Sequence, residues 1–240
     1  MTQAAAGYWG PVTSSVDWCE ENYIHTHYIA EFWNTISSLA MVALGFLGVA
    51  LHHKALGWRL SASYLLIVVV GIGSVLFHAT LQFEHQMWDE VPMVWCACQL
   101  LWVLLDEHGY QGIGYTVAIS LYCAFATYVT SVNKGTTQFF MFQSSFGLNK
   151  RVTRLFHQGC KFLLLALGVW LFDSNLCFVF DHVPNPQFHA WWHVLMCTSL
   201  HYFFVACGHE SIVRAGEQAE IKYFLNMIPY VDKAEKRKEA

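Results

Sequence analysis

The stretch LSASYLLIVVVGIGSVLFHATLQF, residues 60–83, contains no Asp, Glu, Lys or Arg. A helix needs about 20 predominantly apolar residues to cross the ~30 Å hydrocarbon layer of a bilayer. Because lipid offers the backbone no hydrogen bonds, such a segment is expected to be a helix rather than an open strand. The stretch therefore predicts a transmembrane helix, with Ser74 and His78 four residues apart near its end.

The same pattern recurs along the chain. Its 240 residues are 55% hydrophobic and only 12% charged, whereas an average soluble domain has roughly 25% charged residues. Further uncharged runs occupy 32–53, 91–105, 108–133 and 182–209. We predict an all-α, polytopic transmembrane helical bundle over 32–212, between a lumenal segment, 1–31, and a cytoplasmic tail, 213–240.

Basic residues orient this bundle, because they favour cytoplasmic loops. Lys54 and Arg59 lie in the first loop and the tail carries KAEKRK, whereas the second loop and residues 174–190 have no Lys or Arg. A lumenal N-terminus and a cytoplasmic C-terminus require an odd number of passes. The predicted spans are 32–52, 62–82, 88–105, 112–131, 160–180 and 189–209, and an abnormally short fifth pass at 135–149 makes seven.

Targeting and charge exclude some functions. The start MTQAAAGYWGP has neither the basic residues nor the apolar core of a signal peptide, so we expect the first span to act as the insertion signal. The net charge of −4 provides no basic face for nucleic acid. The chain is expected to work in the membrane on a membrane partner.

Two histidines four residues apart stand in QFHAWWHVLMC, residues 187–197. His189 and His193 share a helix face and could hold one zinc ion, although hydrogen-bonded helix packing explains the same spacing. His78 ends the second span, on the side where the last span begins if the chain crosses seven times. Three histidines with an open fourth position describe a catalytic zinc.

Two further polar groups suit hydrolysis at such a metal. Asp89 and Glu90 open the predicted third span, with Pro92 in its first turn, where no backbone donor is needed. Adjacent helical residues point about 100° apart, so only one carboxylate can face the metal. Asp89 suits a general base and Ser74 an oxyanion donor. Alternatively, Ser74 bonds to its own helix and Asp89 interacts with the helix dipole.

An acidic cluster precedes the first span, in VDWCEENYIHTHYIAEFWNT. Carboxylates, an amide and a backbone carbonyl suit calcium, which takes six to eight oxygen ligands. A solvated acidic surface beside the membrane is the alternative. The cluster comprises Asp17, Glu20, Glu21, Asn22 and Glu31.

The pieces GYWGPVTSSVDWCEENY, YIAEFWNTISS, GSVLFHATL, WDEVPM, WLFDSNLC and QFHAWWH, in this order, resemble the alkaline ceramidase family, in particular its phytoceramidase-like members. The resemblance implies membership of a wider group of intramembrane zinc hydrolases that also includes the adiponectin receptors and related proteins. The resemblance implies seven transmembrane helices and residence in the endoplasmic reticulum or Golgi.

The resemblance also implies roles for individual residues. It places the zinc ligands on His78, His189 and His193, and the catalytic pair on Ser74 and Asp89. It implies a lumenal disulfide between Cys19 and Cys177, and Asp173 supporting a zinc histidine from the second shell. The implied calcium ligands are Asp17, Trp18 through its carbonyl, Glu20, Asn22 and Glu31.

The implied activity is zinc-dependent, calcium-activated hydrolysis of the amide of ceramide, phytoceramide or dihydroceramide, giving a sphingoid base and a free fatty acid. The expected enzyme is a monomer. Residues 132–150 depart from the family's full apolar fifth helix, which keeps a catalytically impaired isoform or a lipid-binding protein open as an alternative. A proton or ion channel would use the same buried Asp and His residues as a relay.

Overall fold

The computed structural model describes residues 7–107, 109–110, 112–132, 153–181 and 183–234. Helices dominate these residues, and two short strands follow the last helix. The elements in chain order are α1 (Phe32–His52), α2 (Trp58–Thr80), α3 (Phe83–Glu107), α4 (Ile113–Val132), α6 (Thr153–Asn175), the 3₁₀ helix η1 (Cys177–Asp181), α7 (Phe188–Arg214), β1 (Ala219–Phe224) and β2 (Ile228–Lys233).

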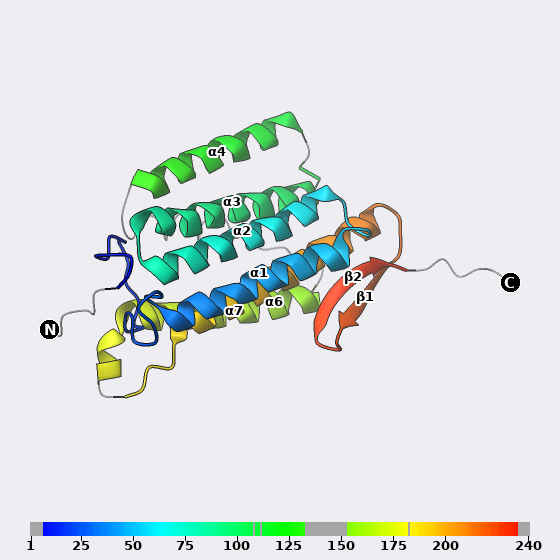
Figure 1. Cartoon of the computed structure of the whole chain (residues 1–240). Helices are drawn as coiled ribbons and strands as arrows, with labels where there is room; N and C mark the ends of the chain where they lie inside the picture. Colours follow the sequence, from blue (N-terminus) through cyan, green and yellow to red (C-terminus); the bar gives the residue numbers. More distant parts are fainter. Residues whose placement is uncertain (1–6, 108, 111, 133–152, 182, 235–240) are drawn as a thin grey trace.

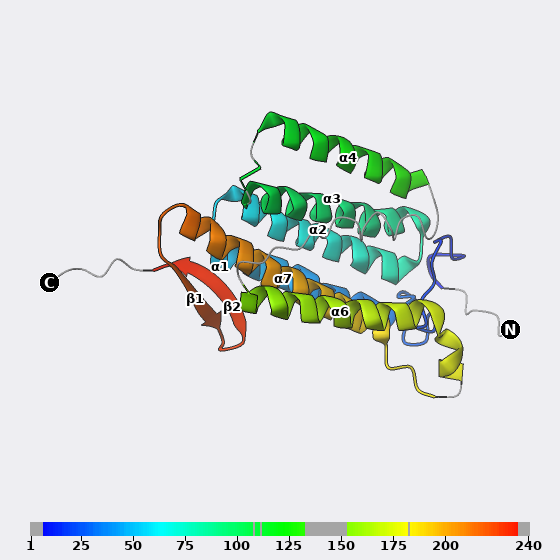
Figure 2. The same cartoon turned by 180° about the vertical axis from the view of Figure 1, so that it is seen from behind.

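The α-helices run roughly side by side along one direction (Figures 1 and 2). α1 packs on α2 and α7, α2 packs on α3, and α4 and α6 lie on the outside against α3 and α7. The main apolar core lies among α1, α2, α3 and α7, and includes Tyr64, Leu100 and Phe204. The N-terminal segment covers one end of the bundle, and the two strands lie at the other end.

The predicted helical membrane protein is confirmed for five helices, which are long and apolar enough to cross a bilayer. α7 has 27 residues, carries four histidines and is not among these five helices. It runs beside α1 and α6 (Figure 1), and His189, His193 and His201 are buried. The five helices are Phe32–His52, Trp58–Thr80, Phe83–Asp106, Ile113–Val132 and Arg154–Asn175.

The predicted short pass at 135–149 lies outside the described residues. Its neighbours in the chain are placed: Val132 ends α4 at the end of the bundle that holds the N-terminal segment, and Thr153 begins α6 at the opposite end (Figure 1). α6 runs back to the end of the bundle that holds the N-terminal segment, so α7 begins at the same end where α2 ends.

The prediction that Pro92 occupies the first turn of the third span is wrong, because α3 begins at Phe83. The backbone N–H of Phe83 donates to Thr13 Oγ1 at 2.9 Å, so the N-terminal segment satisfies a donor that the first turn leaves open. Asp89 therefore lies in the second turn. Pro92 lies inside the helix, where it has no N–H to donate to the Trp88 carbonyl.

The N-terminal segment also caps α1. Glu31, the residue before α1, makes no side-chain cap hydrogen bond. Instead, the two carboxylate oxygens of Glu20 accept the N–H groups of Trp33 at 2.7 Å and Asn34 at 2.9 Å. The segment 7–31 is thus attached to the bundle by hydrogen bonds to the ends of α1 and α3.

Two departures from the predicted elements concern the C-terminal half. The predicted sixth span, 160–180, begins earlier as α6 and ends at Asn175, after which the chain forms η1. The region beyond α7, predicted as a tail, contains two strands. β1 pairs antiparallel with β2, with Ala219 opposite Lys233 at one end and Phe224 opposite Ile228 at the other. The fold is a helical bundle with a two-stranded hairpin, which we call the C-terminal hairpin.

We expect Glu20→Ala to destabilise the protein by about 1–2 kcal/mol, the cost of losing a helix cap. Thermal unfolding in detergent with a calcium chelator present measures this effect separately from any loss of metal. Glu21→Ala is the matched control, because Glu21 is the exposed neighbour. Equal unfolding temperatures for the two variants would contradict the capping role.

Candidate metal centre

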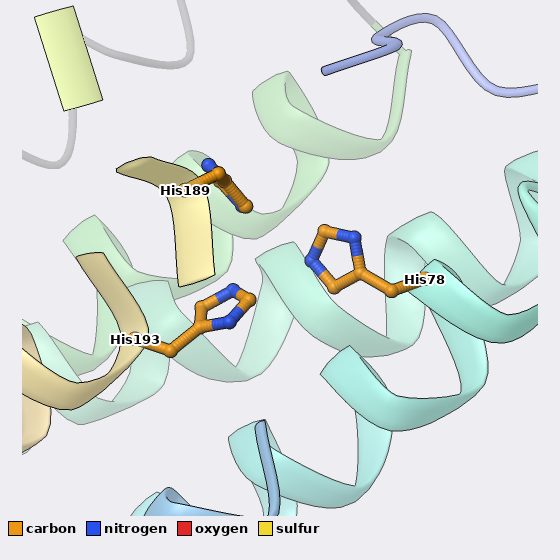
Figure 3. Close-up of side chains that lie close together, drawn as sticks. All are labelled: His78, His189 and His193. Carbon is orange, nitrogen blue, oxygen red and sulfur yellow. The ribbon is translucent and has the colours of Figure 1, made fainter. Parts of the chain in front are cut away.

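Three buried histidines from α2 and α7 come together at the end of the bundle beside the N-terminal segment. The ring centroid of His78 lies 5.1 Å from that of His189 and 4.9 Å from that of His193. One ligand atom from each of the three lies within 4.8 Å of the others. Figure 3 shows the three side chains converging from the two helices. The three residues singled out from the sequence are therefore adjacent in space.

The hydrogen bonds of His78 leave one nitrogen open. Its Nδ1 contacts the Glu31 carboxylate, which can only accept when ionised, so Nδ1 carries the proton and Nε2 keeps its lone pair. Nε2 is buried and has no hydrogen-bond partner among the described residues. Buried polar nitrogens are normally paired. A metal ion would supply the missing partner.

The other two histidines offer lone pairs in the same way. The Ser37 hydroxyl donates to the Asn34 carbonyl at 3.0 Å and therefore accepts the Nδ1 proton of His193 at 2.8 Å. This leaves the lone pair of His193 on Nε2. His189 has a buried Nδ1 with no partner in the described part of the chain. Neutral imidazoles with free lone pairs are the donors that zinc prefers.

A second pair of buried histidines shows the contrast. His201 donates from Nε2 to the Pro229 carbonyl at 2.7 Å and accepts at Nδ1 from the Tyr64 hydroxyl at 3.0 Å. His52 donates from Nδ1 to the Gly48 carbonyl at 2.8 Å and accepts the Val231 N–H at Nε2 at 3.3 Å. All four nitrogens are used. These two histidines are neutral structural groups with nothing to offer a metal.

Ser74 and Asp89 lie beside the three histidines. Ser74 Oγ is 3.5 Å from Nε2 of His193 and 2.9 Å from Ser38 Oγ. The Asp89 carboxyl hydrogen-bonds with the Ser74 side chain and is buried. The two groups expected to act with the metal are therefore next to each other and to one of its ligands.

A close approach of two backbones produces this arrangement. A Cβ added to Gly73 would lie 2.0 Å from the Trp88 carbonyl oxygen and 2.8 Å from the backbone N of Asp89. Only glycine fits against the backbone of α3 at this point. The Trp88 carbonyl is also the one that Pro92 leaves without its helical hydrogen bond. Gly73 thus brings α3 close enough for Asp89 to reach Ser74.

Asp173 supports a histidine through the main chain. Its carboxylate accepts the backbone N–H of Cys19 at 3.1 Å and that of His189. The contact is made to the first turn of α7, not to an imidazole ring. The structure joins Cys19 and Cys177 in a disulfide, and Trp18 stacks on the His189 ring with centroids 3.7 Å apart.

The acidic cluster lies directly against the histidines. Asn22 donates from Nδ2 to the Asp17 carboxylate at 3.2 Å, which leaves its buried Oδ1 without a partner among the described residues. Glu31 contacts Asp17, and it accepts the Trp18 N–H at 3.2 Å. Burial raises the pKa of Asp17 and of Glu20, and repulsion from Glu31 raises both pKa values further. A bound cation would stabilise the ionised form of these carboxylates.

Several contributors to the centre are not among the predicted site residues: Asn34, Ser37, Ser38 and Gly73. Glu31 is predicted as a calcium ligand and not as the partner of His78. Glu31, Asn34, Thr35 and Ser38 are buried and follow the i, i+3, i+4, i+7 spacing of one helix face. A polar stripe on an otherwise apolar helix is the signal that identifies this face.

Three buried histidines that could hold a metal ion lie beside a carboxyl group and a hydroxyl inside a helical bundle, which is the donor set of a hydrolytic metal centre in a membrane protein. Comparison with protein families gives the particular group. The Ceramidase family model matches residues 10–149 and 147–232. The chain belongs to the ceramidase family.

Curated relatives agree over most of their length. The chain is 30% identical to alkaline ceramidase 3 of Mus musculus, over 94% of each chain, and 30% identical to the alkaline ceramidase of Arabidopsis thaliana, over 99% of each. It is 27% identical to an alkaline ceramidase of Saccharomyces cerevisiae, over 86% of this chain and 79% of the yeast protein. The expected family and hydrolase class are thereby confirmed.

We expect purified protein to carry one zinc ion per chain, and His193→Ala to lose it, because that variant removes one of three ligands. His201→Gln is the matched control: it lies on the same helix and is buried, but both its nitrogens bond within the protein. Elemental analysis of the monodisperse fraction from size-exclusion chromatography measures the zinc content. Zinc loss in both variants, or in neither, would contradict the assignment.

Proposed function

We propose that this chain hydrolyses the amide bond of a ceramide-type lipid, releasing a sphingoid base and a free fatty acid. The observation that carries the proposal is the unpartnered Nε2 of His78, buried beside two more histidines in a chain of the ceramidase family. The relatives' names supply the substrate class, which comes to this chain as part of the proposal. Phytoceramide and dihydroceramide are within that class.

The metal ligands in this proposal are Nε2 of His78, Nε2 of His193 and Nδ1 of His189. Zinc bound to three imidazoles acts as a Lewis acid that polarises a carbonyl oxygen and lowers the pKa of water toward ~7. Glu31 and Ser37 hold the protons on the opposite nitrogens of His78 and His193, which keeps each lone pair directed inward. Trp18 fixes the plane of the His189 ring by stacking on it.

Asp89 and Ser74 divide the remaining work. The Asp89 carboxylate accepts a proton from the attacking water and returns it to the departing amine nitrogen, which becomes the amino group of the sphingoid base. The Ser74 hydroxyl donates a hydrogen bond to the oxyanion that develops on the former amide carbonyl. The contact between the two side chains keeps the proton acceptor beside the reacting carbon.

Calcium activation is the second part of the proposal. The ligands would be Asp17, Glu20, Asn22, Glu31 and the Trp18 carbonyl, and the unpartnered Asn22 Oδ1 supports a cation there. Among the His, Cys, Asp and Glu side chains of the described residues, only the three histidines bring three ligand atoms within 4.8 Å of one another. The acidic cluster would have to contract around calcium, and Glu31 would transmit this change to His78.

The topology of the proposed enzyme follows the sequence prediction. We propose seven passes, a lumenal segment 1–31 with the calcium site, a bundle 32–212 with the zinc site, and a cytoplasmic region 213–240. The catalytic end would then face the lumen of the endoplasmic reticulum or Golgi, where the Cys19–Cys177 disulfide persists. We propose that the enzyme acts as a monomer.

One observation keeps a catalytically impaired or lipid-binding protein as the second candidate function. The family model matches in two stretches that meet at 147–149, within the region where the sequence departs from the family pattern. An altered region there would leave the metal centre intact, since none of the centre's residues belongs to it. Zinc binding without ceramide turnover would favour this second candidate.

We expect Asp89→Asn to lower the turnover of ceramide about 10²–10⁴-fold, the usual contribution of a general base, while zinc is retained. Glu90→Gln is the matched control, because Glu90 accepts from Gln86 at 2.8 Å rather than facing Ser74. Lipid mass spectrometry of proteoliposomes, normalised to zinc content, measures the turnover. Equal activity of Asp89→Asn and wild type would defeat the proposed mechanism.

We expect Gly73→Ala to lower kcat about 10²-fold with zinc retained, because the added methyl group pushes α3 and Asp89 away from Ser74. Gly71→Ala is the control on the same helix: its Cβ would meet Val42 of α1 at 2.8 Å, away from Asp89. Both variants are strained, so thermal unfolding is measured alongside kcat. A similar loss of kcat in both would show that Gly73 matters for packing alone.

A further inference from the structure

The C-terminal hairpin has a turn whose side chains are apolar and exposed. The exposed fractions are 56% for Tyr223, 37% for Phe224, 73% for Leu225 and 72% for Met227. We call these four residues the hairpin tip. They belong to the run YFLNMIPYV, residues 223–231, which contains no charged residue. Exposed apolar patches on a folded protein mark sites of contact with another apolar phase.

The fold itself does not account for Leu225. Three residues lie between the strands, and the first two, Leu225 and Asn226, have φ angles of 50° and 59°. Turn positions with a positive φ favour glycine, asparagine or aspartate, and a branched side chain is disfavoured there. Asn226 suits the turn, whereas Leu225 is both strained and largely exposed. Its side chain is better explained by a contact made outside the chain.

Buried hydrogen bonds to β2 fix the direction of the hairpin. His201 on α7 donates to the Pro229 carbonyl, and His52 at the end of α1 accepts the Val231 N–H. Val231 is fully buried against the bundle. The tip is therefore held at a set position relative to α1 and α7.

The charged residues of the hairpin lie outside the uncharged run, toward the open end. Lys222 pairs with Asp232 at 2.9 Å, and Lys233 pairs with Glu217 at 2.8 Å. The hairpin is thus amphipathic along its length, with ion pairs toward the open end and apolar side chains at the turn. This is the division expected of an element that enters an interface from the aqueous side.

The position of the turn indicates the phase that it enters. In Figure 1 the turn points away from the C-terminus and lies just below the start of α6. This helix is a candidate membrane span. Because the end of a span lies at the boundary of the hydrocarbon layer, the tip would lie at the depth of the headgroups and first acyl carbons.

We propose that the hairpin tip inserts into the lipid interface at this end of the bundle, with bilayer lipid as its partner. Leu225 and Met227 enter the acyl region, and Tyr223 lies at the headgroup level, as aromatic residues at membrane interfaces do. The tip then fixes the depth of the ends of α1 and α7 through Val231 and Pro229. This proposal concerns membrane contact and is independent of catalysis.

Fluorescence quenching tests the proposal on the full chain in lipid nanodiscs, where both faces are open to water. A nitrobenzoxadiazole label on Leu225→Cys reports the tip, and the same label on Glu220→Cys, an exposed site on β1, is the matched control. Unsubstituted protein carried through labelling gives the background from the native cysteines. Met227→Cys repeats the measurement if Leu225→Cys does not fold.

We expect the label at the tip to show a blue-shifted emission, quenching by lipid bearing a nitroxide near the headgroup, and loss of quenching by aqueous iodide. The label at residue 220 should show the reverse. Iodide quenching at the tip equal to that at residue 220 would overturn the proposal. Protection from both quenchers together with a dimeric mass would also overturn it, in favour of a second copy covering the tip.

Discussion

The contact between the Glu31 carboxylate and Nδ1 of His78 determines how the centre is built. An imidazole presents a lone pair on one nitrogen only while the other holds its proton. Glu31 is itself held by the Asn34 amide and the Trp18 N–H. These two hydrogen bonds orient the Glu31 carboxylate independently of its contact with His78. Without it the ring could rotate or change tautomer, and the inward lone pair of His78 would be lost.

This constraint explains why the segment 7–31 is attached so closely to the helix ends. The N–H of Glu31 donates to the His78 carbonyl at 2.9 Å, and that of Ala30 to the Ala79 carbonyl at 2.9 Å. The end of this segment is thus hydrogen-bonded to the end of α2, and Glu31 connects it to the start of α1. Glu20 and Thr13 add caps to α1 and α3. Hydrogen bonds from the N-terminal segment, together with a small apolar cluster of Ala30, Phe77 and Leu81, organise the end of the bundle that holds the three histidines.

The opposite end depends on a different balance. Tyr64 and Phe204 are fully buried there, and a Cβ on Gly48 would meet the Tyr64 ring at 2.1 Å. This end is closely packed, with large side chains against a glycine. The His52 and His201 bonds attach the hairpin to this packed surface.

Much of the fold and the centre could be predicted from the sequence because two periodicities are strong. Uncharged runs of about 20 residues predict membrane helices, and the four-residue spacing of His189 and His193 predicts a shared face. The true start of α3 could not be predicted, because the cap at Thr13 is 70 residues away in the sequence. The hairpin could not be predicted, because its attachment to the bundle depends on His52 and His201, which lie far from its strands in the sequence.

The role of each histidine depends on its partners rather than on its type, spacing or burial. His193 and His201 are both buried on α7, and each lies opposite a residue of α1 or α2. His201 donates and accepts within the protein, so both nitrogens are satisfied and the ring acts as a cross-link. Nδ1 of His193 is hydrogen-bonded to Ser37, whereas its Nε2 makes only a weak contact with Ser74, at 3.5 Å, on a ring that lies beside His78. In a membrane interior an open lone pair costs free energy, and an ion bound where the three rings meet would offset that cost.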